Sequence, residues 1–215
     1  LLSIKAIRAY VSLVSNFSGN GSELSILENT ANKMEVNLNT VLWNKDYNYL
    51  MNNIEAGELD THYYGGSLLA AHFNTIDRDK LDKLITTAKS KLVDNKIGVY
   101  TVYPMDFENL QEEWHLQNNE SGPKYQYMNG GIWPHINVWY ALALARNNEK
   151  EEAINFIKTT MTIDGIMEGP NGQPAMYEVR NSNKENPNEY GEIDKPQFTW
   201  AGGWYLYSLY HILGI

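Results

Sequence analysis

Apolar residues recur at helical spacing in short segments that come in pairs, and a long irregular stretch follows each pair. In residues 4–14, for example, Ile4, Ile7, Val11 and Val14 fall on one face of a helix. The same pattern predicts helices over 4–14, 22–42, 67–73, 77–92, 133–146, 150–163 and 199–213. Only a short turn joins the helices of a pair, so each pair is expected to form a helical hairpin.

This arrangement predicts the fold class. Helical hairpins that close into a ring bury the inner helices on both sides, so we expect an all-α fold, an α/α toroid, with minor β pieces such as the strand-like run at 99–103. Segment 199–213 is apolar nearly all round, which predicts a buried helix. The irregular stretches 95–126 and 165–196 are expected to gather at one rim and to carry the functional site.

The composition argues against several classes of function. The formal net charge is -9 and the isoelectric point is near 5.0, and such a surface repels nucleic acid. No apolar run reaches the roughly 20 residues that a membrane-spanning helix needs. The absence of Cys excludes disulfide scaffolds and Cys-ligated zinc. The first apolar segment carries Lys5 and Arg8 and lacks the order of a signal peptide, so a cytoplasmic location is expected.

Aromatic and amide side chains are unusually frequent. The chain has 6 Trp and 15 Tyr, and Asn occurs in nearly every segment. Flat rings with a polar edge and neutral amides bind ligands that are uncharged and rich in hydroxyl groups, which makes an oligosaccharide or a small glycoside the expected ligand. The alternative is that the Tyr and Trp residues are ordinary core and that the Asn content has no functional cause.

One motif is more specific. Residues 129–135 read Asn-Gly-Gly-Ile-Trp-Pro-His and open a predicted helix. This resembles the Asn-Gly-x-x-Trp-Pro signature of inverting glycosidases with an (α/α)6 barrel, a broad group that includes glucoamylases, glycogen-debranching glucosidases and processing α-glucosidases. Segments 63–70, 177–178 and 196–204 are similar, in the same order, to other parts of that barrel. The resemblance implies that residues 1–215 form a single toroid domain or the C-terminal half of a larger catalytic domain.

The resemblance also implies a mechanism. It places a general base at Glu178, in a loop before the last helix, and a general acid upstream of Leu1. Inverting hydrolysis needs both groups, with the two carboxyl groups about 6.5–9.5 Å apart. If residues 1–215 carried both, the best substitutes for the acid would be Asp60 and the adjacent Glu112 and Glu113.

The sugar pocket implied by the resemblance consists of Asn129, Trp133, His135, Tyr177 and Trp200. Each of these residues has a structural alternative. The tryptophans can fill a core, Asn129 can serve a turn, and His135 can make a structural hydrogen bond. For Glu178 the alternative is a surface salt bridge to Arg180.

These observations predict a glycoside hydrolase that cleaves a glucosidic bond, α-linked, with inversion. The alternatives are a non-catalytic sugar-binding half-barrel and a sugar isomerase on the same fold, which needs paired histidines. His62, His72, His115 and His211 are scattered without metal-ligand spacing, so neither a metal nor a cofactor is predicted. Half a ring exposes apolar helices along its edges, so an N-terminal half-barrel polypeptide or self-association is the expected protein partner.

Overall fold

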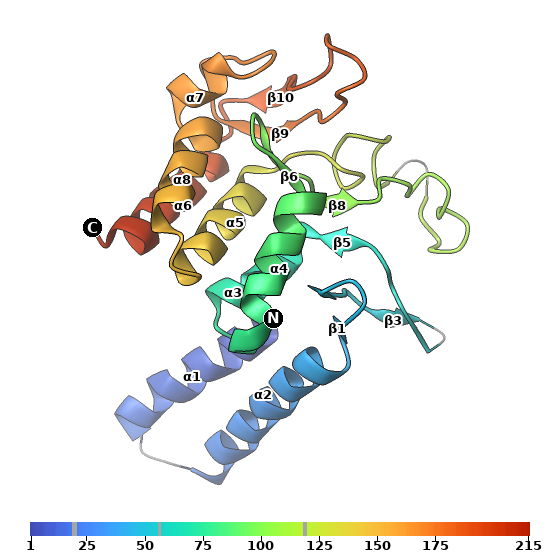
Figure 1. Ribbon diagram of the computed structural model, residues 1–215. Helices are drawn as coiled ribbons and strands as arrows, with labels where there is room; N and C mark the ends of the chain where they lie inside the picture. The colour runs from blue at the N-terminus through green and yellow to red at the C-terminus, as the bar shows by residue number, and fades with distance from the viewer. Residues whose placement is uncertain (19–20, 56, 118–119) are drawn as a thin grey trace.

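The computed structural model describes residues 1–18, 21–55, 57–117 and 120–215 and is mostly α-helical (Figure 1). The helices are α1 (Leu2–Ser18), α2 (Ser22–Thr40), the 3-10 helix η1 (Gly65–Leu68), α3 (Leu69–His72), α4 (Arg78–Lys91), α5 (Pro134–Arg146), α6 (Lys150–Met161), α7 (Ile163–Glu168) and α8 (Thr199–Leu213). The strands are β1 (Trp43–Asn44), β2 (Tyr49–Leu50), β3 (Ile54–Glu55), β4 (Glu58–Leu59), β5 (Tyr63–Tyr64), β6 (Val93–Asp94), β7 (Gly98–Val99), β8 (Val102–Tyr103), β9 (Tyr177–Arg180) and β10 (Ile193–Pro196). The expected helical class with minor β pieces is confirmed.

The predicted helical pairs are present. Helices α1 and α2 pack together, and Arg8 of the first pairs with Glu35 of the second at 2.5 Å. Helix α4 packs on η1, and α6 packs on α5. The structure differs from the prediction in several places. Helix α1 continues to Ser18, α2 ends at Thr40 and α6 at Met161, the short helix α7 follows α6, and the stretch 165–196 contains the antiparallel pair β9 and β10.

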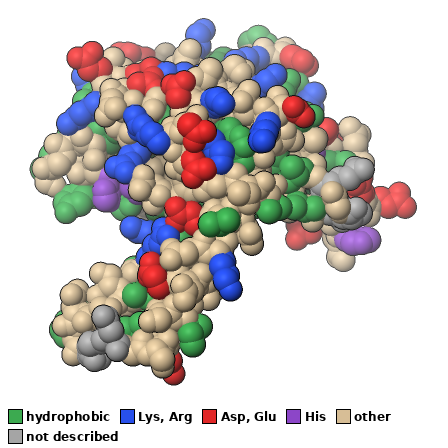
Figure 2. Space-filling model, turned by 60° about the horizontal axis from the view of Figure 1, so that its bottom comes forward, with side chains coloured by type: hydrophobic (Ala, Val, Ile, Leu, Met, Phe, Trp, Pro, Cys, Tyr) green, Lys and Arg blue, Asp and Glu red, His purple; other side chains and the backbone are tan. Residues whose placement is uncertain are grey.

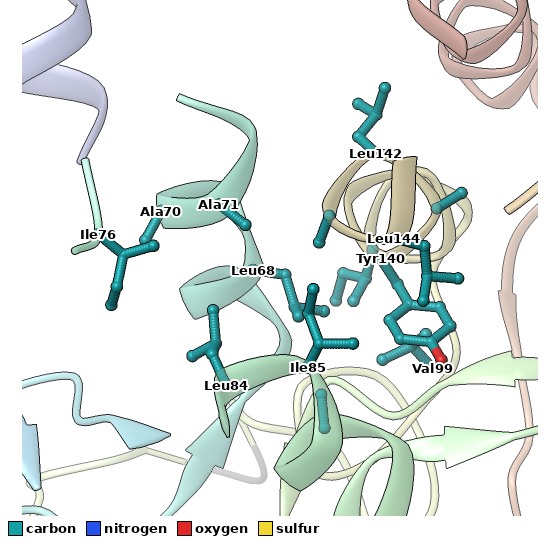
Figure 3. Packing of buried hydrophobic residues seen from close by; sticks show 14 of the residues in the cluster. Leu68, Ala70, Ala71, Ile76, Leu84, Ile85, Val99, Tyr140, Leu142 and Leu144 are labelled. Atoms are coloured by element: carbon teal, nitrogen blue, oxygen red, sulfur yellow. The ribbon is translucent and has the colours of Figure 1, made fainter. Parts of the chain in front are cut away.

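The core lies around α5. This helix contacts η1 and α3 on one side and α8 on another, and α6 packs along it. Figure 3 shows Leu68 of η1, Ile85 of α4 and Tyr140 of α5 pointing into one apolar cluster. Gly65 lets η1 approach α5 closely, because a Cβ atom at this position would lie 2.4 Å from Cγ2 of Ile136.

Backbone hydrogen bonds join the segments that precede η1, α5 and α8, and we call these joined segments the rim. Strand β5 pairs with β8, and the Thr101 N–H donates to Gly131 O at 3.0 Å. Ile132 and Arg180 exchange both backbone hydrogen bonds at 2.9 Å, and β9 pairs with β10. Because β5 leads into η1, Ile132 into α5 and β10 into α8, the N-termini of three helices meet at this rim.

The prediction that segment 199–213 is buried all round is wrong. Helix α8 contains no Asp, Glu, Lys or Arg, yet its exposed apolar side chains, such as Tyr207 at 36% and Leu206 at 66%, face outward. The hairpin of α1 and α2 is also apolar on exposed faces, with Phe17 82% exposed. Figure 2 shows this hairpin projecting from the remaining molecule as a lobe. Hydropathy indicates that a helix avoids water, but it does not show what covers the helix.

Among the described residues, no helix combines the length and the apolar character that crossing a membrane requires.

Candidate functional site

Glu178 lies in strand β9 rather than in a loop, and its side chain is 16% exposed. The predicted alternative partner was Arg180, but the ion pair is formed with Lys195 of the adjacent strand β10. Arg180 is fully buried instead and donates to two backbone carbonyls, those of Pro170 at 2.7 Å and Gly191 at 2.9 Å. The pairing of the two strands therefore decides which cation faces the carboxylate.

Lys195 holds together three side chains of the rim. Its ammonium group contacts Glu178 and donates to the Tyr127 hydroxyl at 2.6 Å, while Asp194 lies 3.8 Å away. The hydrogen bonds to Glu178 and Tyr127 raise the pKa of Lys195 above its ordinary value, so the ammonium stays charged. The carboxylate at 178 thus sits beside a permanent positive charge and a phenol.

Five rings form a tryptophan cluster where α5 and α8 begin. Its members are Trp133, His135, Trp139, Trp200 and Trp204. Tyr127 connects this cluster with the ion pair of Lys195 and Glu178. Its hydroxyl accepts from Lys195, its ring lies 6.0 Å from that of Trp133, and its backbone carbonyl accepts from Trp133 Nε1 at 3.1 Å. Among the predicted site residues, Trp133, His135 and Trp200 therefore lie in one cluster, and Glu178 is linked to it through Lys195 and Tyr127.

Two polar atoms inside the tryptophan cluster are buried without a hydrogen-bond partner among the described residues. They are Nδ1 of His135 and Nε1 of Trp139, and the two rings lie 4.6 Å apart. Burial lowers the pKa of His135 to about 4, so the imidazole is neutral at pH 7. Both atoms are buried, so the part of the cluster that a ligand can reach is the ring of Trp200, which is 43% exposed.

The structure places Asn129 and Tyr177 beneath the rim rather than on it. Both side chains are fully buried. Asn129 Oδ1 accepts from the Phe107 N–H at 3.3 Å, and the Tyr177 hydroxyl contacts Asn137 Nδ2 at 3.3 Å. The predicted sugar contacts of these two residues are therefore corrected: with no exposed atom, they support the site from below.

The substitute acids are not suited to their predicted role. Asp60 is largely buried, which raises its pKa, but hydrogen bonds from the ring and backbone of His62 outweigh burial and lower the pKa below its ordinary value. A general acid needs a raised pKa instead, so Asp60 stays ionised. Glu112 and Glu113 are exposed in a turn.

Two histidines far apart in sequence meet at the end of α8. The rings of His72 and His211 lie 5.3 Å apart, and His72 Nε2 shares a hydrogen bond of 2.8 Å with the Tyr207 hydroxyl. The expectation of scattered histidines is wrong for this pair. Tyr207 also contacts Trp204, so the pair continues the aromatic stripe of α8. Within the described ranges, no group of three or more His, Asp or Glu residues has the geometry of a metal site.

Sequence reasoning missed Tyr127, Lys195, Trp139 and Trp204. The two tryptophans had a usable signal, because each lies four residues after a predicted site residue on the same helix face. Lys195 and Tyr127 had none. Lys195 reaches Glu178 through the pairing of β9 with β10, and Tyr127 contacts Lys195 from a turn more than 50 residues away in sequence.

We expect protonation of His135 to destabilise the fold in acid. The folded-state pKa of about 4 lies below that of the unfolded chain, so the unfolded state binds the extra proton between about pH 6.5 and 4. The free energy of unfolding should fall across this range as the pH falls, by up to about 3 kcal/mol from this group. Urea unfolding of the wild type and of His135→Gln at pH 7 and pH 4.5 measures it. Equal pH dependence in both proteins would contradict the burial argument.

No protein-family model matches this chain, and no curated protein matches it.

Proposed function

We propose that the protein is a saccharide-binding hydrolase that cleaves an α-glucosidic bond with inversion and uses Glu178 as the general base. One observation carries the proposal: a partly exposed carboxylate, that of Glu178, is linked through Lys195 and Tyr127 to an aromatic cluster in which Trp200 is 43% exposed. Stacking faces bind the sugar ring, and the carboxylate takes a proton from the attacking water.

The remaining part of the proposal is a ring of helical hairpins completed by a second polypeptide segment, which supplies the general acid. Its support is the uncovered apolar surface of α1, α2 and α8, which includes Phe17 at 82% and Leu206 at 66% exposed. Exposed apolar surface of this extent is typical of an interface. If that second segment supplies the acid, Asp60, which His62 keeps ionised, is not needed for this role.

A second function has its own support. The ion pair with Lys195 occupies the Glu178 carboxylate, and the candidate acids within residues 1–215 are ionised or lie in an exposed turn. These facts favour a non-catalytic sugar-binding protein. Binding without hydrolysis of any glucoside would identify this alternative.

Replacing Trp200 with Ala tests saccharide binding at the tryptophan cluster. Trp200 is 43% exposed and contacts Trp133, His135 and Trp204, so its loss removes one stacking face. We expect affinity for maltotriose to fall about tenfold or more, since tenfold corresponds to about 1.4 kcal/mol. Isothermal titration calorimetry measures it, with Tyr47→Ala as the control because Tyr47 is an exposed tyrosine in the β1–β2 turn. Unchanged affinity in Trp200→Ala would remove the cluster from the site.

A further inference from the structure

His62 joins two carboxylates that the proposed mechanism does not use. Its Nδ1 contacts Asp60 Oδ1 at 2.6 Å and its Nε2 contacts Asp106 Oδ1 at 2.8 Å. The strand pair β5–β8 brings these groups together, because His62 precedes one strand and Asp106 follows the other. Rings of Phe107 and Trp114 pack edge-on against the imidazole of His62, a residue that is 7% exposed.

This node is ionic. Burial alone lowers the pKa of His62, but the hydrogen bonds to Asp60 and Asp106 outweigh it and raise the pKa above the ordinary value. An imidazolium donates from both ring nitrogens, so it fixes both carboxylates. The two ends differ in exposure, because the Asp60 side chain is 7% exposed whereas that of Asp106 is 37% exposed.

Asp106 opens into a hollow of about 420 Å³, which we call the Asp106 hollow. Tyr103, which is 42% exposed, and Tyr125 form part of its wall. Within the described part of the chain, Asp106 Oδ2 makes no hydrogen bond, so one oxygen of a fixed carboxylate remains free. A carboxylate that is already immobilised loses little further freedom when it binds a ligand.

The charges around the Asp106 hollow nearly cancel. Lys184 is paired with Asp94 at 2.9 Å, and its ammonium lies 5.8 Å from the centre of the Tyr100 ring. Lys124 and Glu185 supply one charge of each sign beside Asp106. Such a lining favours neither a strong anion nor a strong cation. It suits a neutral ligand with a flat face and several hydroxyl groups.

We propose that the Asp106 hollow binds one sugar unit of a saccharide, with Asp106 Oδ2 accepting hydroxyl hydrogen bonds and the Tyr103 ring stacking on the sugar face. The site is separate from Glu178 and the tryptophan cluster. The choice of a saccharide as the ligand rests on the proposed function, whereas the residues of the site follow from the structure alone. Asp60 and His62 are positioning residues, since they hold the carboxylate without touching the sugar.

The test maps saccharide binding residue by residue with amide NMR spectra of the isotope-labelled protein. Maltotriose and cellobiose are the probes, and inorganic phosphate is the anion control. Maltotriose should shift amide signals at 103–106 and 124–125, and Asp106→Asn and Tyr103→Ala should each weaken this local binding at least tenfold. Asp79→Asn, an exposed carboxylate on α4, is the matched control and should leave binding unchanged.

The outcomes separate this proposal from the proposed function. Shifts confined to the tryptophan cluster, or local affinity that survives both Asp106→Asn and Tyr103→Ala, would overturn the second site alone. Shifts at 103–106 from phosphate but from neither saccharide would overturn its ligand class. No saccharide shift anywhere would overturn both proposals. If Asp106→Asn does not fold, Tyr103→Ala decides, because Tyr103 lies outside the ionic node.

Discussion

Replacing Glu178 with Gln is expected to lower hydrolysis of an α-glucoside by a factor of about 10²–10⁴, the typical contribution of a positioned general base. Gln has nearly the shape of Glu but cannot accept the proton of the attacking water. Saccharide affinity should change little, because the tryptophan cluster remains intact. The measurement is the turnover of maltotriose by the protein together with the second segment that supplies the general acid. Proton NMR identifies the anomer that is released.

Glu192→Gln is the matched control for this prediction. Glu192 is an exposed carboxylate next to strand β10, and its side chain has no role in the proposed site. It should retain wild-type turnover. Turnover of Glu178→Gln within a factor of a few of the wild type would reject Glu178 as the base. Retention of configuration in the product would reject the inverting mechanism, but it would not reject a catalytic role for the Glu178 carboxylate.

The largest stability effect is expected from Tyr140→Ala. Tyr140 of α5 is 1% exposed, its ring packs edge-on against Phe156 of α6 at 4.8 Å, and it lies in the cluster drawn in Figure 3. Truncating a buried aromatic residue removes its packing and leaves a cavity, which costs about 3–5 kcal/mol. Since domains are stable by about 5–15 kcal/mol, the urea midpoint should fall sharply.

Tyr140→Phe serves as the control, because it keeps the ring and removes only the hydroxyl. A loss of about 1 kcal/mol or less is expected for one hydrogen-bonding group. If Tyr140→Ala were no less stable than Tyr140→Phe, the packing between α5 and α6 would not be part of the stabilising core.

The helices were predictable because each carries its own periodic signal. For α5, Pro134 in the first turn and the apolar run up to Arg146 place both ends nearly where the structure has them. Strands β9 and β10 had no comparable signal, because four-residue strands show too little alternation to be recognised. The exposure of one face of α8 was not predicted, because the hydropathy of a residue describes its preference for an apolar environment and does not show whether another element covers it.

The candidate site was predictable only where its residues were close in sequence. The motif at 129–135 supplied Trp133 and His135, which α5 does place in the tryptophan cluster. The contact between His62 and Asp106 spans 44 positions and depends on the pairing of β5 with β8. Asn129 was mispredicted as a ligand contact because a motif identifies a position without showing which side of the backbone reaches solvent.

The hydrogen-bonded rim fixes where two long loops of the chain begin and end. Its backbone contacts lie at Gly65, Thr101, Ile132 and Arg180, in the segments before or between η1, α5 and α8. Segments 104–130 and 181–192 begin and end at these contacts. Because both ends of each segment are held by backbone hydrogen bonds, we expect a change in the length of either loop to alter the exposed surface more than the helix packing.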